Sequence, residues 1–207
     1  MHETEVEHLD IVDEVLSTAR SVRRNLDFDR PVERQVLLDC IDVAVQAPTG
    51  IAGESWRFVV VEDGDRKAKV AKLYKDILLD LLAARDMPIK PTHQALIDRM
   101  HEIPAMIFVT VEGEPMSADV SSHVGYYGSI LPAAWSLMLA LRARGIGTTW
   151  TSLLAAKREE VNAILGCPSD VVQTVMLPVG YTKGARLKRA DRLPAQQVTY
   201  WNAWGEQ

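Results

Sequence analysis

The feature that most constrains this chain is an uncharged stretch, Val124 to Leu141, whose 18 residues are the lower limit for a membrane-spanning helix. It contains several helix-breaking residues, among them Pro132. In a chain of otherwise average composition, one such stretch is more typical of a helix buried on all sides in a core or a dimer interface. We therefore expect no membrane partner, and a long buried helix over residues 123–144 that stops at Gly145.

Length and composition favour one soluble globular domain. The chain has 207 residues, of which 47% are hydrophobic and 25% charged, as in ordinary soluble proteins. That length suits a single domain with its own core, so we expect one domain over residues 1–207. The net charge of −5 argues against non-specific nucleic-acid binding, which needs a basic surface, and no nucleic-acid partner is expected.

The cysteines and the N-terminus point to a reducing compartment. The two cysteines, Cys40 and Cys167, are far apart and form no CxxC motif, so they do not indicate a disulfide framework. The N-terminus is acidic and shows no signal-peptide pattern. We expect a cytoplasmic protein in which Cys40, on the apolar side of a helix, belongs to the core.

Hydrophobic spacing predicts an α+β fold, because strands mix with long helices without regular βαβ alternation. A basic connector (20–31), an exposed connection or lid (86–94) and a tail (183–207) separate or follow the elements. Helices are expected over 8–19, 33–47, 66–85, 123–144 and 157–165, and strands over 57–61, 105–111, 148–151 and 171–181.

Common catalytic and metal-binding motifs are missing from the sequence. No GxSxG elbow is present. Gly145-x-Gly147 fails as a dinucleotide fingerprint, because Trp150 occupies the third glycine position and the motif follows a helix. The histidines show no metal-ligand spacing, since even His93 and His101 are eight positions apart. We therefore predict no metal site and name no catalytic residue.

Two basic clusters stand out in this acidic chain. One is Arg20-Ser21-Val22-Arg23-Arg24, and the other, between Lys183 and Arg192, includes Arg189. Arginine suits the forked recognition of a phosphate, and serine adds a donor. If the two clusters meet in the fold and bind one phosphate monoester, that role would explain why an acidic chain carries both of them. The alternative is that they are solvated surface charges in connectors, and taken alone the residues favour that alternative.

Five motifs in order resemble the FMN-dependent nitroreductase superfamily, from about residue 15 to the C-terminus. They are Arg20-Ser21-Val22-Arg23-Arg24, the run from Ala47-Pro48-Thr49-Gly50 to Trp56-Arg57-Phe58, Ala143-Arg144-Gly145-Ile146-Gly147, Val175-Met176-Leu177-Pro178-Val179-Gly180-Tyr181, and Arg192-Leu193-Pro194. The resemblance implies a three-layer sandwich with a mixed central sheet flanked by helices. It also implies a homodimer with exchanged C-terminal tails and FMN at the interface.

The implied chemistry is a ping-pong oxidoreduction. NADH or NADPH reduces the flavin, which then reduces a small molecule such as a nitroaromatic or quinone. The nicotinamide preference and the natural acceptor stay open. The resemblance assigns cofactor binding to Arg20, Ser21 and Arg23 (phosphate and pyrimidine edge), Pro48, Thr49 and Gly50 (from the second subunit), Thr151, Ser152 and Leu153 (near flavin N5), and Arg192 (phosphate). The match to the family pattern is uncertain by one position here, so it leaves open whether Thr151 or Ser152 faces flavin N5.

The chain departs from the family pattern at several places. Ala19, Ala52 and Glu54 replace an arginine, an asparagine and a glutamine of the family, and Ser55 replaces a proline. Loss of one charge-assisted contact would weaken FMN binding by roughly tenfold to a hundredfold. Two other interpretations therefore stay open: a flavin-binding or sequestering protein without turnover, and a narrower flavin enzyme that dehalogenates iodotyrosines or fragments the flavin.

Overall fold

The structure, a computed structural model, describes residues 3–50 and 53–206 and divides into two compact units. Residues 20–185 form the core unit. The chain ends, up to Ala19 and from Arg186, form a terminal unit that holds α1 (Glu3–Thr18) and the short helix η3 (Ala195–Gln197). The expectation that residues 1–207 make one domain stays a prediction.

The core unit is built on four strands in the order β1-β2-β4-β3. They are β1 (Trp56–Val61), β2 (Ala105–Glu112), β3 (Ile146–Thr148) and β4 (Val171–Tyr181). All three neighbouring pairs are antiparallel. The mixed sheet expected from the resemblance is therefore wrong for the described strands.

The antiparallel β1–β2 pair follows from a connection of two helices rather than one. The chain leaves β1 through α3 (Gly64–Ala84), returns through α4 (Pro91–Arg99) and the 3₁₀ turn η1 (Met100–Glu102), and then enters β2. Lys67 Nζ, at the start of α3, donates a hydrogen bond of 2.8 Å to the Ile103 carbonyl, just before β2. The return helix thus brings the chain back to the end of the sheet that it left.

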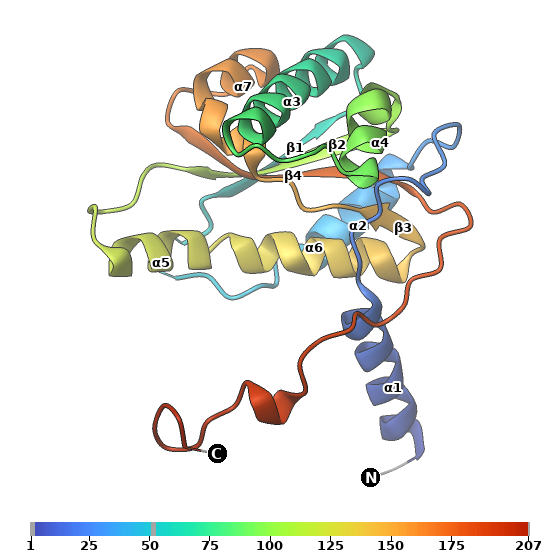
Figure 1. The fold of residues 1–207 in the computed structure, drawn as a ribbon, viewed down its shortest axis with the longest axis vertical. Coiled ribbons are helices and arrows are strands. Elements are labelled where there is room, and N and C mark those ends of the chain that lie inside the picture. Colours follow the sequence, from blue (N-terminus) through green and yellow to red (C-terminus); the bar gives the residue numbers. More distant parts are fainter. Residues whose placement is uncertain (1–2, 51–52, 207) are drawn as a thin grey trace. The chain divides into compact units, whose positions relative to one another are not determined.

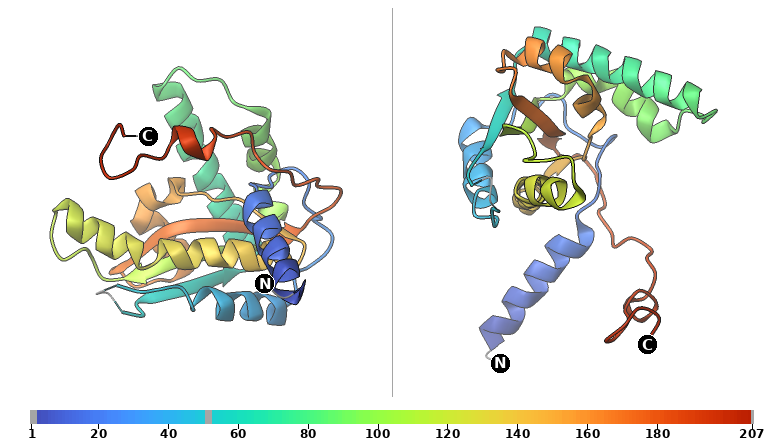
Figure 2. Two further views of the ribbon diagram at one scale, coloured as in Figure 1. Left: turned by 90° about the horizontal axis from the view of Figure 1, so that it is seen from below. Right: turned by 90° about the vertical axis from the view of Figure 1, so that its left-hand side faces the viewer.

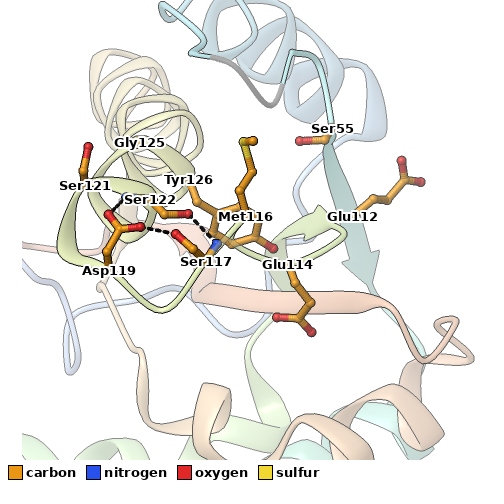
Figure 3. Close-up of a pocket in the computed structure, with 10 residues that line it drawn as sticks. All are labelled: Ser55, Glu112, Glu114, Met116, Ser117, Asp119, Ser121, Ser122, Gly125 and Tyr126. Atoms are coloured by element: carbon orange, nitrogen blue, oxygen red, sulfur yellow. Dashed lines mark hydrogen bonds between the residues drawn. The ribbon is translucent and has the colours of Figure 1, made fainter.

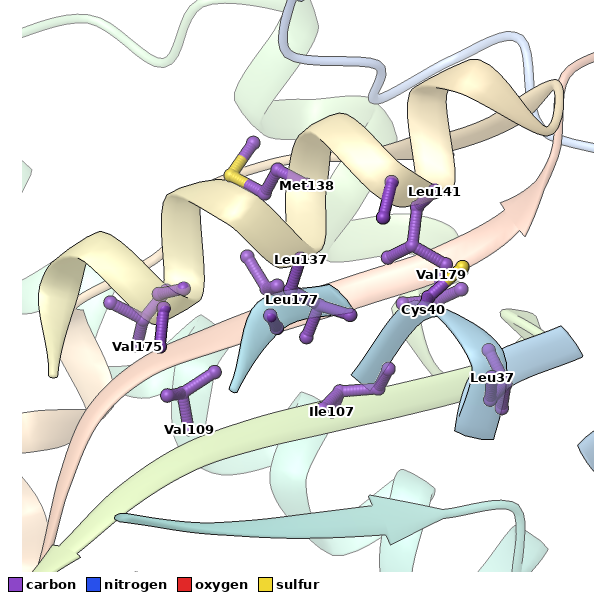
Figure 4. Packing of buried hydrophobic residues seen from close by; sticks show 14 of the residues in the cluster. Leu37, Cys40, Ile107, Val109, Leu137, Met138, Leu141, Val175, Leu177 and Val179 are labelled. Carbon is purple, nitrogen blue, oxygen red and sulfur yellow. The ribbon is translucent and has the colours of Figure 1, made fainter. Parts of the chain in front are cut away.

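Helices cover both faces of the sheet, which confirms the three-layer arrangement (Figure 1). On one face lie α3, α4 and α7 (Arg158–Leu165), and on the other lie α2 (Arg34–Ala44), α5 (Val120–Gly128) and α6 (Leu131–Ala143). The second face holds the main core, where Leu37 and Cys40 of α2 and Leu137 of α6 pack against Ile107 and Val175 of the sheet (Figure 4). The views of Figure 2 show the same layering. The expectation that Cys40 is a core residue is confirmed.

The single helix expected over 123–144 is two helices, α5 and α6, separated at Ser129 and Ile130. Pro132 stands in the first turn of α6 and has no backbone N–H to continue the ladder of α5. Nor is the stretch buried on all sides, since Trp135 is 40% exposed. Taken as one helical run, Val120–Ala143 is long and apolar enough to cross a membrane, and half of its most apolar window is buried.

Other boundaries differ less. The short strand expected over 148–151 begins earlier, as β3, and only an isolated bridge joins Thr151 to Met176. Helix α2 ends three residues before Ala47, the last residue of the expected helix. Helix α7 ends at Leu165, and Gly166 after it has a left-handed conformation (φ 72°) that a residue without Cβ adopts readily. Trp56 is buried in the core.

Candidate functional site: a pinned arginine segment beside β3

The basic segment before α2 is held along the edge of the sheet by backbone hydrogen bonds. The Val22 N–H donates to the Thr148 carbonyl at 2.8 Å, and the Asp27 N–H donates to the Tyr181 carbonyl at 2.7 Å. Between them, Leu26 forms a bridge with Thr182. The segment that carries Arg20, Ser21 and Arg23 is therefore fixed beside the end of β3, although it has no regular structure of its own.

Gly147 allows this close approach. A Cβ at this position would lie 2.9 Å from both Leu26 Cδ2 and Thr182 Cγ2, and 3.0 Å from Val22 Cβ. Real Cβ atoms essentially never lie under 3.0 Å from another heavy atom. A glycine in β3 is thus what lets the arginine segment lie flat against the strand.

The polar side chains of the pinned segment are open for a ligand. Arg20 and Ser21 are exposed and Arg23 is half-buried. Within residues 3–50 and 53–206, no hydrogen bond or ion pair occupies these three side chains. Two guanidinium groups and a hydroxyl on a fixed backbone suit the recognition of a phosphate. The residues present therefore fit the phosphate end of FMN.

In the segment after β3, the side chains of the neighbouring residues Thr151 and Ser152 lie in different environments. Thr151 is buried, and its hydroxyl donates a hydrogen bond of 2.7 Å to the Met176 carbonyl. Its backbone N–H and carbonyl are paired with Met176 as well. Ser152 is exposed, and Leu153 is half-buried at the start of η2 (Leu153–Lys157). Of the two hydroxyls, only that of Ser152 lies open to a ligand.

The loop Pro48-Thr49-Gly50 lies elsewhere in the core unit. All three residues are exposed. The Gly50 N–H donates to Ser129 Oγ at 2.8 Å, and Ser129 Oγ in turn donates to the Gly125 carbonyl at 2.8 Å. The loop is therefore tied to the junction between α5 and α6. Ser129 is a residue that sequence reasoning missed, and Ala52 lies outside the described residues.

Helix α6 separates the two groups of predicted site residues. Ser129 precedes its N-terminus, whereas its C-terminus leads into β3, beside which Arg20, Ser21 and Arg23 lie. The 13 residues of α6 correspond to a length of about 20 Å. In the described part of one chain, no hydrogen bond or ion pair links the two groups. Arg192 belongs to the terminal unit, so its place relative to these residues stays a prediction.

The charge of Arg23 influences the pKa of two residues that the sequence did not indicate. Burial raises the pKa of Tyr74 in α3, and the charge of Arg23 opposes that rise. Burial lowers the pKa of His93 in α4, and the charges of Arg23 and Lys90 lower it further. From the sequence, Tyr74 is one more residue of an amphipathic helix, and only its neighbours in space reveal it.

A separate cavity of about 440 Å³ opens at the start of α5, and none of the predicted site residues lines it (Figure 3). Its polar groups already have partners. Asp119 caps α5 by accepting from the Ser122 N–H at 2.9 Å and from the Ser117 hydroxyl. Glu114 pairs with Arg158. The cavity thus offers no unpaired cation for a phosphate among the residues that line it.

The sequence matches the protein-family model described as "Nitroreductase family" over residues 16–181. The chain belongs to the nitroreductase family. The match covers the pinned segment, the 48–50 loop and all four strands. It ends before the basic tail that holds Arg192.

The relatives with which the chain was compared include deiodinases and a bacterial dehydrogenase. Iodotyrosine deiodinase 1 of Rattus norvegicus is 28% identical over 201 residues, which cover 89% of this chain and 67% of the relative. NADH dehydrogenase of Thermus thermophilus is 26% identical over 196 residues, which cover 88% of this chain and 91% of the relative. The chain thus spans about two thirds of the deiodinases and nearly all of the bacterial protein.

Among solved structures, an oxidized iodotyrosine deiodinase bound to FMN and 3-iodo-L-tyrosine has the same fold. Its TM-score is 0.70 at 22% identity, and the match covers 94% of this chain and 100% of that one. At this identity the likeness shows the nitroreductase fold alone. It confirms the α+β fold class expected from the sequence.

Proposed function

We propose that this protein is an FMN-dependent oxidoreductase. The observation that carries the proposal is the pinned segment, whose Arg20, Ser21 and Arg23 side chains have no partners in the described chain. Membership of the nitroreductase family supports it, as does the FMN in the deiodinase structure of the same fold. Arg20, Ser21 and Arg23 would hold the phosphate and the pyrimidine edge, with Arg192 of the tail as a further phosphate contact.

Bound FMN would supply hydride acceptance and donation, while this chain supplies placement. Ser152, with its exposed hydroxyl, is the donor that we assign to the N5 side of the ring. The proposed donor is NADH or NADPH, and the proposed acceptor is a nitroaromatic, a quinone or a related small molecule, reduced in a ping-pong cycle. We expect this to take place in the cytoplasm, without a membrane or nucleic-acid partner.

The first experiment is the visible spectrum of the purified protein before and after incubation with FMN. We expect a flavin spectrum at about one FMN per subunit. The double variant Arg20→Ala/Arg23→Ala should keep its fold and lose FMN affinity by at least tenfold to a hundredfold. Unchanged flavin content in this variant would refute the phosphate assignment. Lys69→Gln, which removes an exposed charge on α3, is the matched control.

We also propose that the working form is a homodimer in which the 48–50 loop of one subunit completes the site of the other. The support is that the loop and the pinned segment lie at opposite ends of α6. Gly50→Val should disturb the loop, because even a Cβ at this position would lie 2.7 Å from Ser129 Oγ.

Mixing two defective variants tests this arrangement directly. Neither Arg20→Ala/Arg23→Ala nor Gly50→Val should bind FMN well alone. After joint refolding, mixed dimers should recover tight sites at up to one per dimer, because one of their two FMN sites combines both intact elements and the other carries both defects. Recovery of no sites, with dimers present by sedimentation, would show that each subunit binds FMN by itself.

Reductive deiodination is the second candidate, because the rat relative and several others are iodotyrosine deiodinases. Product analysis with 3-iodotyrosine, in parallel with NADH and NADPH oxidation in the presence of menadione or nitrofurazone, separates the two activities. Bound FMN without turnover of any acceptor would instead favour a flavin-sequestering protein.

A further inference from the structure

The hydroxyl of Ser129 is buried at the junction of α5 and α6, where it joins two backbone groups that are far apart in sequence. Ser129 is only 3% exposed. Its Oγ donates to the Gly125 carbonyl and accepts from the Gly50 N–H, both at 2.8 Å. A hydroxyl has a single proton to donate. Because that proton goes to the Gly125 carbonyl, the oxygen presents only lone pairs to Gly50, which suits the N–H that it receives.

The contact between Gly50 and this hydroxyl is close, and the hydroxyl is fixed. A Cβ on Gly50 would lie 2.7 Å from Ser129 Oγ and 3.6 Å from the Gly125 carbonyl oxygen. The backbone N–H of Ser129 also donates to the carbonyls of Gly125 and Tyr126, at 3.2 Å each. Both the backbone and the side chain of Ser129 are thus bound to α5. The hydroxyl is therefore a rigid anchor for the 48–50 loop.

The anchor decides which donors of the loop remain for a ligand. Pro48 has no backbone N–H. The Gly50 N–H goes to Ser129, and the Gly50 carbonyl accepts from the Gly53 N–H at 3.1 Å. In the described part of the chain, no hydrogen bond occupies the N–H or the hydroxyl of Thr49, which is exposed. The free donors of Thr49 thus lie directly beside an anchored residue, which reduces the conformational entropy that binding would cost.

We propose that Ser129 is a positioning residue for the flavin: it fixes the Gly50 N–H and so holds the free donors of Thr49 in place for contact with FMN. This inference rests on the proposed function, in which the loop of one subunit completes the site of the other. Ser129 acts through the loop, because its hydroxyl is buried and its hydrogen-bonding partners are backbone groups of its own chain.

Hydrogen exchange of the Gly50 amide tests the anchor without FMN. In Ser129→Ala the Gly50 N–H loses its acceptor, so it should exchange at least about tenfold faster than in the wild type. The matched control is Ser122→Ala, because Ser122 Oγ accepts from the Ser117 N–H at 3.0 Å near the other end of α5. This control should leave the exchange of Gly50 unchanged. Equal Gly50 exchange in Ser129→Ala and the wild type would overturn the proposal.

The affinity for FMN tests the consequence of the anchor. Ser129→Ala should weaken FMN binding by about threefold to tenfold, which corresponds to one net hydrogen bond, whereas Ser122→Ala should leave it unchanged. Ser129→Cys, which keeps the size of the side chain but offers a weaker acceptor, should have an intermediate affinity and carries the comparison if Ser129→Ala does not fold. Affinities of the Ser129 variants equal to that of Ser122→Ala would refute the positioning role.

Heterodimers reveal which of the two sites is weakened. Ser129→Ala is paired with Arg20→Ala/Arg23→Ala, and the heterodimer is isolated with two different affinity tags. One of its sites combines the intact pinned segment of the first subunit with the intact loop of the second, and it should bind FMN with wild-type affinity. If that site keeps the lowered affinity of the Ser129→Ala homodimer, Ser129 acts within its own subunit or through general stability, and the proposal is wrong.

The outcomes separate this inference from the proposed function. If the wild type binds no FMN, the proposed function fails and this inference fails with it. If the wild type binds FMN, and Ser129→Ala binds it equally well although its Gly50 amide exchanges faster, the proposed function stands and only the positioning role is refuted.

Discussion

The backbone N–H of Val22 donates a hydrogen bond of 2.8 Å to the carbonyl of Thr148. This contact joins a segment that is basic and irregular to the last residue of β3, which lies more than 120 positions later in the chain. It gives the arginines of the pinned segment a fixed backbone. Fixed donors bind an anion with a smaller loss of conformational entropy than donors on a free connector.

Substitution of Gly147 should damage both stability and cofactor binding. Gly147→Ala places a Cβ within 3.0 Å of Val22, Leu26 and Thr182, so the pinned segment must move. We expect a loss of about 1–3 kcal/mol in the free energy of unfolding, measured in urea, together with weaker FMN binding. Gly64→Ala is the control, because nothing lies within 4 Å of its added Cβ. Equal behaviour of the two variants would contradict the close approach at β3.

The neighbouring hydroxyls of Thr151 and Ser152 should have separable roles. Thr151→Val removes one of the two donors to the Met176 carbonyl, which keeps the Thr151 backbone N–H, and should cost about 1 kcal/mol of stability, the net value of one hydrogen bond. Ser152→Ala should leave stability within about 0.5 kcal/mol, since the residue is exposed, and should change the redox behaviour of bound FMN. Urea denaturation and a flavin potential measured on each variant check this. The reverse pattern would assign the N5 contact to Thr151.

Asn162 should be an important polar residue for stability. Its Nδ2 donates to the carbonyls of Pro168 and Val171, at 3.0 and 3.1 Å, and its Oδ1 accepts from Gln173. Asn162→Ala leaves the buried Gln173 amide without its acceptor, while the Pro168 and Val171 carbonyls keep the Val171 N–H and Arg158 Nε as donors, and it should cost about 1–3 kcal/mol. Thermal unfolding measures the effect, with Asn25→Ala, an exposed site, as the control. A loss no larger than that of the control would mean that water replaces the amide.

The Glu33–Tyr181 pair should make stability depend on pH on the acid side. The Tyr181 hydroxyl donates to Glu33 Oε2 at 2.7 Å, and this bond is the main reason that the pKa of Glu33 is lowered in the folded protein. A lowered pKa contributes stability that is present above the unfolded value, about 4.3, and is lost as the pH falls through the folded value.

The measurement compares the melting temperatures of the wild type and Tyr181→Phe. The difference between them at about pH 7 should shrink as the pH falls through the lowered pKa of Glu33 in the folded wild type, because the protonated carboxyl no longer favours this bond. Tyr181 also carries the guanidinium of Arg30 over its ring, at 3.4 Å from the centroid, and Tyr181→Phe keeps that ring. A difference that stays constant with pH would show that Glu33 does not contribute through this bond.

The predicted elements agree with the structure where local spacing decides. The helices expected over 66–85 and 157–165 and the strand expected over 105–111 depend on side chains that lie within a few residues of one another. One prediction fails for a local reason, because Pro132 divides the uncharged stretch into two helices. Another fails where distant chain decides, because the return through α4 makes β2 antiparallel to β1.

By itself, the sequence determined most of the helices and strands, the core position of Cys40 and, through five motifs in order, the resemblance to the nitroreductase family that the family match confirms. These are local or cumulative properties of the chain. Only the tertiary structure decided that Thr151 is buried and Ser152 open, and that the 48–50 loop and the arginine segment lie at opposite ends of α6. Each of these depends on contacts between segments far apart in sequence, and no local pattern encodes which segments will meet.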